Sequence, residues 1–319
     1  MKRIAVLTSG GDSPGMNSAI RAVVRRAIYR NLEVIGIKHG YQGLLDNEFC
    51  PMDVSSVGDI IQRGGTILHT ARCLNFKQKP FQQLALNNML ANHIDGLIVI
   101  GGDGSFHGAL ALSDLGMPTI GIPGTIDNDI AGTDTTLGFD TAINTVIEAV
   151  DKIRDTATSN ERTFVIEVMG RQSGYIALYS GLAAGAESIL VPEYTPNFDE
   201  IVNRLEQGIK RGKQHSIIIV AEGVATGAAV AKILESKTGL EIRVAVLGYI
   251  QRGGNPTATD RLLGSRMGAA SVELLLDGKS GYMVGEKCGN IIALPLKECL
   301  DKRHEISAKA FELARSLAI

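Results

Sequence analysis

The sequence predicts an α/β protein with a doubly wound, parallel sheet. Two short apolar runs rich in β-branched residues, Leu97–Ile100 and Thr119–Ile122, each end abruptly at a glycine-containing loop. Such runs are typical of strands buried on both faces of a parallel sheet. Between them, Ser105–Leu115 is long enough for the crossover helix of a βαβ unit. The alternation continues along the chain, and a length of 319 residues is consistent with two domains.

The N-terminal segment predicts a strand, a turn and a helix. Arg3–Thr8 is an apolar run typical of a strand, and Gly10–Gly15 is a glycine-rich turn. From Met16 onward, apolar residues recur on one face of an amphipathic helix. The turn has Walker A glycine spacing, but Met16 and Asn17 stand where that loop requires Lys and Ser or Thr. It is not a GxGxxG fingerprint either, although the helix N-terminus that it opens could hold a phosphate.

The later elements follow the same pattern. Strand and helix signals alternate through Glu33–Ile37, Ser55–Gln62 and Phe81–Ala91, and a long helix is predicted over Thr141–Thr156. Further strands are predicted at Thr163–Val168, Ser188–Val191, Ser216–Val220 and Arg243–Leu247, and helices at Asp199–Arg211 and Asp260–Leu276. No low-complexity segment or linker marks a domain boundary.

Composition excludes several classes of function. A net charge of −2 and a pI near 6.3 argue against nucleic acid or an anionic membrane as a partner. The four cysteines lack paired metal-ligand spacing, and a chain of this size does not need a disulfide framework. No apolar segment approaches the roughly 18 residues that span a bilayer. We expect a protein of the reducing cytoplasm.

Three carboxylates follow the two central strands. Asp103 comes just after the first of them, and Asp127 and Asp129 follow the second. In open α/β sheets ligands bind outside the carboxyl ends of the strands, where these side chains are expected to gather. Turn formation by Asp and Asn explains the second loop about as well. The functional interpretation is Mg²⁺ carrying a phosphate, with a base beside an attacking hydroxyl, which indicates phosphoryl transfer.

The phosphates need positive charge from outside the N-terminal turn, since that turn lacks a P-loop lysine. Arg72 and Arg171 are candidates, because a guanidinium binds phosphate oxygens bidentately. A single arginine is nevertheless more often a solvated surface residue. Glu222, at the end of a predicted strand, is equally well a ligand carboxylate or an ordinary strand-end charge. Arg21 and Arg25 lie four residues apart on the first helix, where a solvated basic face is the simpler explanation.

Five motifs together resemble the ATP-dependent, bacterial-type 6-phosphofructokinase family. They are SGGDSPGMN near the start, GGDGS at Gly101–Ser105, PGTIDND at Pro123–Asp129, MGR at Met169–Arg171 and QRGG at Gln251–Gly254. The match covers nearly the whole chain. It implies transfer of the γ-phosphoryl group of MgATP to the 1-hydroxyl of fructose 6-phosphate. It also implies two Rossmann-like domains facing across a cleft: 1–138 plus about 251–300 for ATP, and 139–250 plus about 301–319 for the sugar phosphate.

The resemblance assigns roles to the matching positions. Asp127 would take the proton of the sugar hydroxyl, with Asp129 and Thr125 beside it, and Arg171 would bridge the transferring group. Asp103 and Asp129 would lie on the Mg²⁺ side. The implied ATP contacts are Gly11, Arg72, Cys73, Gly102, Asp103, Gly104 and Ser105. The implied fructose 6-phosphate contacts are Thr125, Ile126, Asp127, Met169, Gly170, Arg171, Glu222, Tyr249 and Arg252, with Arg162 and Arg243 from a neighbouring subunit of a homotetramer.

The resemblance also implies an allosteric site for ADP as activator and phosphoenolpyruvate as inhibitor. Its residues would be Arg21, Arg25, Arg154, Gly185, Glu187, Arg211, Lys213 and His215. Two positions depart from the family pattern. Gln214 stands where relatives commonly have lysine, and Tyr249 where they typically have histidine against the 6-phosphate.

Three alternatives remain open at the level of sequence. A pyrophosphate-dependent phosphofructokinase typically carries Asp and Lys where this chain has Gly104 and Gly124, so ATP is favoured. A dinucleotide-binding oxidoreductase lacks its fingerprint here. A non-catalytic sugar-phosphate sensor would have no use for Asp127 as a base.

Overall fold

The computed structural model describes residues 1–302 and 304–318, which group into two compact units. Unit 1 contains Met1–Ile126, Ile130–Thr141 and Arg252–His304. Unit 2 contains Asp127–Asp129, Ala142–Gln251 and the residues from Glu305 onward. The chain therefore passes between the units several times. Which unit binds ATP and which binds the sugar phosphate stays a prediction.

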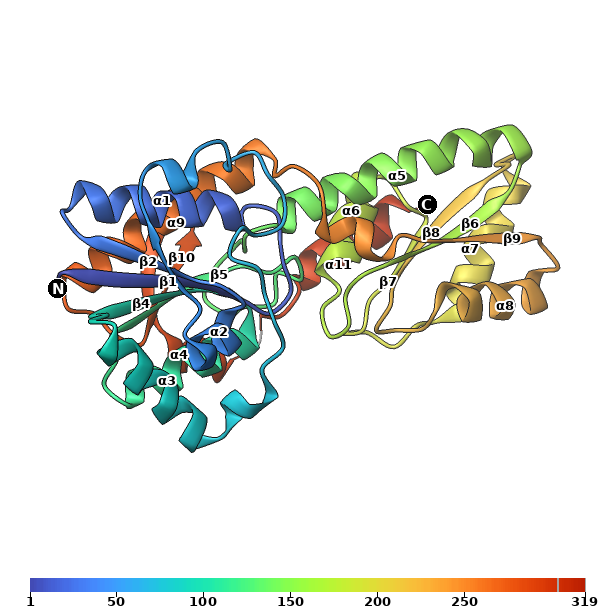
Figure 1. Ribbon diagram of the computed structural model, residues 1–319. Coiled ribbons are helices and arrows are strands. Elements are labelled where there is room, and N and C mark those ends of the chain that lie inside the picture. Colours follow the sequence, from blue (N-terminus) through green and yellow to red (C-terminus); the bar gives the residue numbers. More distant parts are fainter. Residues whose placement is uncertain (303, 319) are drawn as a thin grey trace. The chain divides into compact units, whose positions relative to one another are not determined.

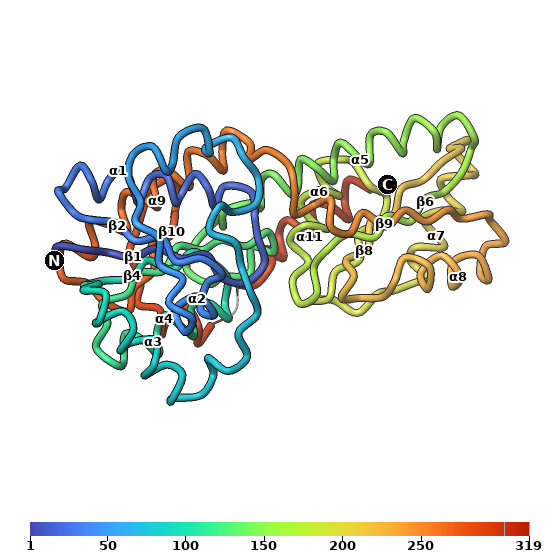
Figure 2. Tube along the Cα trace, in the orientation of Figure 1, coloured from blue at the N-terminus to red at the C-terminus, as the bar shows by residue number. Residues whose placement is uncertain are grey.

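Unit 1 is built on a seven-stranded sheet with the order β11-β10-β5-β4-β1-β2-β3 (Figure 1). Its strands are β1 (Arg3–Ser9), β2 (Glu33–Ile37), β3 (Phe49–Met52), β4 (Gly96–Gly101), β5 (Thr119–Pro123), β10 (Tyr282–Lys287) and β11 (Asn290–Pro295). The five inner strands are parallel, and the edge strands β3 and β11 are antiparallel to their neighbours. Figure 2 shows β1 and β4 side by side, although they are far apart in sequence. They lie in the middle of the strand order.

Helices cover both faces of this sheet, as the doubly wound prediction requires. They are α1 (Met16–Tyr29), α2 (Gly40–Asp46), α3 (Lys79–Ala91), α4 (Asp103–Asp114), α9 (Ala258–Leu276) and α10 (Leu296–Leu300). Because side chains alternate along a strand, Ile4 and Val6 pack with the core under α1 and α9. Ala5 and Leu7 pack on the other face, with α2, α3 and α4 (Figure 1).

Unit 2 is a smaller α/β unit with four parallel strands in the order β7-β8-β6-β9. Its strands are β6 (Thr163–Val168), β7 (Ser188–Leu190), β8 (Ser216–Ala221) and β9 (Ile242–Val246). Its helices are α5 (Phe139–Asn160), whose first three residues belong to unit 1, α6 (Tyr175–Ala183), α7 (Phe198–Lys210), α8 (Gly227–Thr238) and α11 (Ala308–Leu317). Helices α7 and α8 bury Leu205 and Leu234 against the sheet, and α6 packs on β7 and β8 and against α11.

The α/β class is confirmed, while some elements differ from their predictions. Strands β3, β10 and β11 had no sequence signal, and β10 and β11 extend the sheet as an antiparallel hairpin beside β5. The signal over Ser55–Gln62 corresponds to a single 3₁₀ turn at Ser55–Val57. Helix α4 begins at Asp103, two residues before the predicted helix, so Asp103 is its first residue and not a loop residue.

A buried carboxylate fixes the start of α5. Asp260, on α9, is fully buried and accepts hydrogen bonds from the backbone N–H of Gly138 (2.8 Å) and Thr141 (2.9 Å). It also accepts one from the Thr141 hydroxyl at 2.5 Å. Burial raises the pKa of Asp260, and these hydrogen bonds oppose the shift because they favour the ionised form. Asp260 therefore satisfies N–H groups at the first turn of α5, which would otherwise be without a partner there.

Within the described residues, none of the helices combines the length and the apolar character needed to cross a membrane.

Candidate active site

Three glycine-bounded strand ends meet at one edge of unit 1. Strands β1, β4 and β5 are adjacent and parallel, with Ser9 opposite Gly101 and Gly101 opposite Pro123. Beyond them, the Gly124 N–H donates to the Gly101 carbonyl at 3.0 Å. Strand β1 leads to α1 on one face and β4 leads to α4 on the other, so this edge is the switch point where doubly wound sheets bind ligands.

The turn between β4 and α4 brings together four of the predicted ATP contacts. Gly102 is the N-cap of α4, and Asp103, Gly104 and Ser105 form its first turn. A helix N-terminus offers N–H groups and a partial positive charge, which suit a phosphate. The Asp103 side chain is 60% exposed and lies 3.8 Å from Nε2 of His107. An ideal Cβ at Gly104 has no atom within 4 Å, so the space beside it is open.

The segment carrying Arg72 and Cys73 is held near the end of β1. The Thr8 hydroxyl donates to the His69 carbonyl at 3.0 Å and is 2.9 Å from the Thr66 hydroxyl. Arg72 is exposed, while Cys73 packs against the apolar core beneath α2, α3 and α4. The side chain of Cys73 thus has a structural role, and a contact of this residue with ATP stays a prediction.

The sequence QRGG occurs twice, at residues 62–65 and at Gln251–Gly254, and the second of these runs closely approaches two glycines in unit 1. An ideal Cβ on Gly11 would lie 2.1 Å from Nη1 of Arg252. An ideal Cβ on Gly64, in the first QRGG run, would lie 2.2 Å from the carbonyl oxygen of Gly254. The buried Asn17 side chain donates to the Gly64 carbonyl at 3.2 Å and fixes this loop. The two QRGG runs therefore contact each other, and the guanidinium of Arg252 lies against the N-terminal turn.

The PGTIDND segment is divided between the units. Thr125 and Ile126 belong to unit 1, where the Thr136 hydroxyl donates to the Thr125 carbonyl at 2.6 Å. Asp127–Asp129 belongs to unit 2. Asn128, between the two aspartates, is buried and has a left-handed φ of 50°. The buried hydroxyl of Ser173 donates to the Asp127 carbonyl at 2.7 Å. Sequence reasoning missed Ser173, although it lies two residues after Arg171.

The carboxyl ends of β6 and β8 gather the predicted sugar-phosphate residues. Val168 is opposite Ala221, so Met169–Arg171 and Glu222 begin neighbouring loops. The Glu222 N–H donates to Val168 at 2.9 Å, and the Gly223 N–H donates to Gly170 at 3.1 Å. Both Arg171 and Glu222 are exposed. An ideal Cβ on Gly170, whose φ is 133°, would lie 2.3 Å from the Ser173 carbonyl.

Arg162 and Arg243 lie at the opposite end of the same sheet. Arg162 directly precedes β6, and Arg243 is the second residue of β9. Both form ion pairs with Glu241, which lies 3.4 Å from Arg162. Six residues of β6 extend about 20 Å, so neither side chain shares a site with Arg171 in the same chain. Within one chain the structure therefore does not assemble the complete predicted set.

Tyr249 is held close to the Met169 loop. It belongs to the 3₁₀ segment Gly248–Arg252 and is 82% exposed. Its neighbour Gln251 is fully buried and accepts from the Met169 N–H at 3.2 Å. Gln251 also donates to the Gly248 carbonyl at 3.0 Å, which closes the segment on itself. Gln251 was not predicted as a site residue, yet it ties the second QRGG run to the MGR motif.

Six of the predicted effector residues belong to unit 2, around Glu187. The Glu187 carboxylate forms an ion pair with Lys213 and accepts from the Ile217 N–H at 2.5 Å. Arg154 donates to the Ala184 carbonyl beside Gly185. Arg211 ends α7 and His215 directly precedes β8. The remaining two, Arg21 and Arg25, are on α1 in unit 1.

The described residues contain no group of three or more His, Cys, Asp or Glu side chains that could hold a metal ion by themselves. A nucleotide-bound Mg²⁺ needs fewer protein ligands, since it takes one or two carboxylates and completes its shell with water and phosphate oxygens. The exposed carboxylate of Asp103 fits such a role.

Comparisons with known proteins identify relatives over the full length of the chain. The family model described as "Phosphofructokinase" matches residues 3–275. An ATP-dependent 6-phosphofructokinase of Brevibacillus brevis is 58% identical over 319 residues, covering 100% of both chains. One from Bacillus pumilus is 59% identical, again with 100% coverage of both.

Solved structures show the same similarity. A phosphofructokinase structure from Saccharomyces cerevisiae matches with a TM-score of 0.88 and 36% identity, over 94% of this chain and 45% of that chain. A pyrophosphate-dependent phosphofructokinase from Marinobacter aquaeolei matches with a TM-score of 0.86, covering 100% of this chain and 92% of that one. At 23% identity, that second match shows the fold alone. With the family model spanning most of the sequence, the chain belongs to the phosphofructokinase family.

Proposed function

We propose that this chain transfers the γ-phosphoryl group of ATP to the 1-hydroxyl of fructose 6-phosphate. The observation that carries the proposal is the meeting of three glycine-bounded strand ends in unit 1, with Asp103 at the start of α4. The proposed donor and acceptor are supported by relatives at 58% and 59% identity that are ATP-dependent 6-phosphofructokinases.

In the proposed mechanism, Asp127 accepts the proton of the attacking hydroxyl, which typically contributes about 10²–10⁴ in rate. Ser173 holds the backbone of Asp127 in position through its hydrogen bond to the carbonyl. Arg171 supplies positive charge to the transferring group, and the first turn of α4 binds the donor's phosphates. Mg²⁺, held by Asp103 and Asp129 with the nucleotide, would neutralise charge on the phosphate oxygens when bound.

The choice of ATP over pyrophosphate is assigned to Gly104 and Gly124. Gly104 leaves open space, which the α-phosphate of a nucleotide can occupy. An ideal Cβ on Gly124 would lie 3.1 Å from both Ile100 and Met16, so a side chain there requires those neighbours to shift. Gly104 is therefore the position at which donor choice can be tested with the least disturbance of the fold.

A coupled assay for fructose 1,6-bisphosphate, with ATP or pyrophosphate as donor, tests this function directly. We expect activity with ATP, and we expect Asp127→Ser to lower kcat at least ~10²-fold while ATP still binds. Activity with pyrophosphate alone would refute the donor, and no product with either donor would refute the reaction. Because the substrates are charged metabolites of the cytoplasm, we propose that the protein acts there.

We also propose that the working enzyme is a homotetramer in which Arg162 and Arg243 complete a neighbouring subunit's site. The proposal is supported by the position of Arg162 and Arg243, which lie at the opposite end of β6 from Arg171 and so cannot reach the same site within one chain. Co-expression of an Asp127→Ser chain with an Arg243→Ser chain tests this proposal, since a hybrid oligomer would contain some sites with both residues intact. Activity should partly return in the mixture. If the mixture is as inactive as either variant alone, Arg243 acts within its own chain or not at all.

The unit 2 cluster around Glu187 is proposed to bind ADP as an activator and phosphoenolpyruvate as an inhibitor. Arg154, Arg211 and Lys213 provide the positive charge that an anionic effector requires. Glu187→Ala should change the ADP activation curve without changing the maximal rate, whereas Glu206→Ala, an exposed control on α7, should change neither. An unaltered activation curve in Glu187→Ala would place the effector elsewhere.

A further inference from the structure

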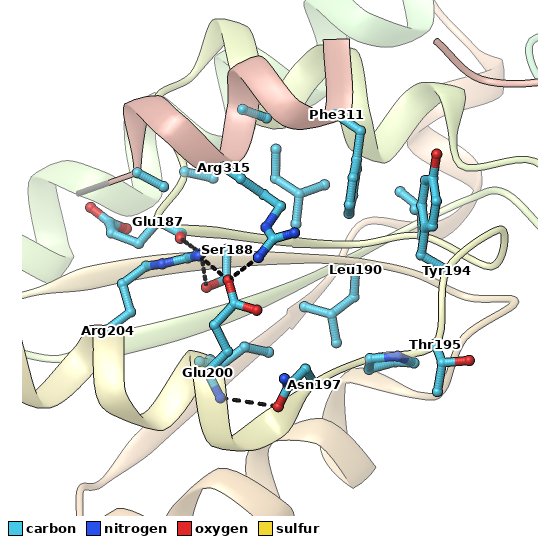
Figure 3. A pocket seen from close by; sticks show the side chains of 17 residues that line it. Glu187, Ser188, Leu190, Tyr194, Thr195, Asn197, Glu200, Arg204, Phe311 and Arg315 are labelled. Carbon is cyan, nitrogen blue, oxygen red and sulfur yellow. Dashed lines mark hydrogen bonds and ion pairs between the residues drawn. The ribbon is translucent and has the colours of Figure 1, made fainter. Parts of the chain in front are cut away.

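Unit 2 contains a cavity of about 410 Å³ whose lining includes one predicted site residue, Glu187 (Figure 3). Its walls are β7, the segment that follows β7, the first half of α7 and the C-terminal helix α11. This volume lies within the ~300–1,000 Å³ of small-molecule sites. The carboxylate of Glu187 is paired with Lys213. Toward the cavity, Glu187 offers its backbone carbonyl, which accepts a hydrogen bond from Arg204.

One end of the cavity is charged. Arg204 on α7 and Arg315 on α11 both donate to the same carboxylate oxygen of Glu200, each at 2.8 Å. Arg204 also donates to the Glu187 carbonyl at 2.8 Å and to the Ser188 hydroxyl at 3.2 Å, and its side chain is only 18% exposed. Figure 3 shows these side chains converging on Glu200. The Glu187 carboxylate is paired with Lys213, so among the described residues at this end two guanidinium groups share the single carboxylate of Glu200 and carry a surplus positive charge.

The other end is aromatic and apolar. The rings of Tyr194 and Phe311 stack with centroids 4.4 Å apart and an interplanar angle of 19°. Leu190 and Ile201, both nearly fully buried, add apolar surface to the lining. Figure 3 shows the two rings on the side of the cavity away from Arg204.

We propose that this cavity binds a small monocarboxylate with an aromatic body, the carboxylate at Arg315 and Arg204 and the body between Leu190 and the Tyr194–Phe311 pair. A guanidinium has five N–H donors, so Arg315 can bind a second carboxylate while one of its nitrogens stays on Glu200. A single negative charge balances the surplus at this end. A phosphate dianion exceeds that surplus, and it leaves the apolar wall without a partner.

The probe is 4-phenylbutyrate, measured by calorimetry on the unaltered protein and by fluorescence on Phe311→Trp. The chain has no tryptophan, so the introduced residue reports from the cavity alone. Two matched probes test the two halves of the ligand separately. 4-Phenylbutanol keeps the aromatic body but lacks the charge, and butyrate keeps the charge but lacks the ring. We expect saturable binding of 4-phenylbutyrate and at least ~10-fold weaker binding of both matched probes.

Arg315→Gln should weaken 4-phenylbutyrate binding about tenfold, because it removes the charged donor but keeps an amide. The control is Arg266→Gln in unit 1, whose arginine is similarly exposed and pairs with Glu286 at 3.1 Å. That control should bind like the unaltered protein. Equal binding by the two variants, equal binding of the three probes, or tighter binding of inorganic phosphate would each overturn the proposal. So would the absence of saturable binding in both the calorimetric and the fluorescence titrations.

Discussion

Ser173→Ala is expected to lower kcat without unfolding the protein. The substitution removes one buried hydroxyl, which donates to the carbonyl of Asp127 at 2.7 Å and lies 3.4 Å from the Tyr175 N–H. A hydrogen bond of this kind contributes about 0.5–1.5 kcal/mol. If that energy is spent on holding Asp127 at the attacking hydroxyl, its loss raises the barrier equally, and kcat falls roughly 2- to 10-fold. Because the role proposed for this hydroxyl is to position Asp127 and not to bind the sugar phosphate, KM for fructose 6-phosphate should change less than kcat.

The assay is steady-state kinetics at saturating ATP together with a thermal melt. Ser180→Ala is the matched control, because Ser180 is a fully buried serine on α6 whose hydroxyl donates at 2.5 Å to its own helix, at Ile176. Both variants should lose similar stability, but only Ser173→Ala should lose rate. If the two variants have the same kcat, Ser173 has no part in positioning Asp127.

The remaining predictions concern the donor, the buried carboxylate and the substituted tyrosine. Gly104→Asp should weaken ATP binding at least ~10-fold in a direct titration, whereas Gly104→Ala, for which there is room, should stay within about twofold. Burial raises the pKa of Asp260, so the folded chain holds this proton more tightly than the unfolded chain does. The protonated Asp260 side chain therefore adds to the free energy of unfolding below the ordinary aspartate pKa of about 3.9. This contribution is lost as the pH rises through the raised pKa of Asp260 in the folded protein. In chemical denaturation, the unaltered protein should therefore gain stability relative to Asp260→Asn as the pH is lowered toward the ordinary aspartate pKa of about 3.9. The exposed Asp277→Asn should not reproduce this change. Tyr249→Phe should raise KM for fructose 6-phosphate if the hydroxyl donates to the 6-phosphate, and Tyr249→His should lower KM at about pH 6 but not at pH 8. An unaltered KM in Tyr249→Phe would mean that the ring is turned away from the phosphate.

The inner strands could be predicted because burial on both faces leaves a plain signal. Leu97–Ile100 and Thr119–Ile122 are continuous apolar runs, and the structure has strands there that are fully buried. The hairpin of β10 and β11 carries no such signal, since most of its residues are at least partly exposed and glycine and charged side chains interrupt β10. Its position beside β5 is set by strand pairing between segments distant in sequence, and this pairing cannot be predicted from the local composition.

The candidate site divides in the same way. Motif positions such as Asp103 and Arg171 are visible in the sequence because their residue types carry the chemistry. The residues that position other motif residues are ordinary ones: Ser173 donates to the Asp127 carbonyl, and Gln251 accepts from the Met169 N–H and donates to the Gly248 carbonyl. The cavity beneath α11 could not be predicted either, because it joins Arg204 and Arg315, which are distant in sequence and individually resemble surface arginines.

The two close approaches of the second QRGG run make opposite genetic predictions. A side chain at position 11 meets the guanidinium of Arg252, the movable end of a flexible side chain, so Gly11→Ala should be accommodated by a shift of Arg252 or by a shorter residue at position 252. A side chain at position 64 collides with the carbonyl oxygen of Gly254, a backbone atom that every amino acid possesses. No exchange of residue 254 removes that atom. A selection for revertants of Gly64→Ala should therefore return glycine at position 64 or changes that shift the whole loop, and the two glycines differ in how readily evolution can replace them.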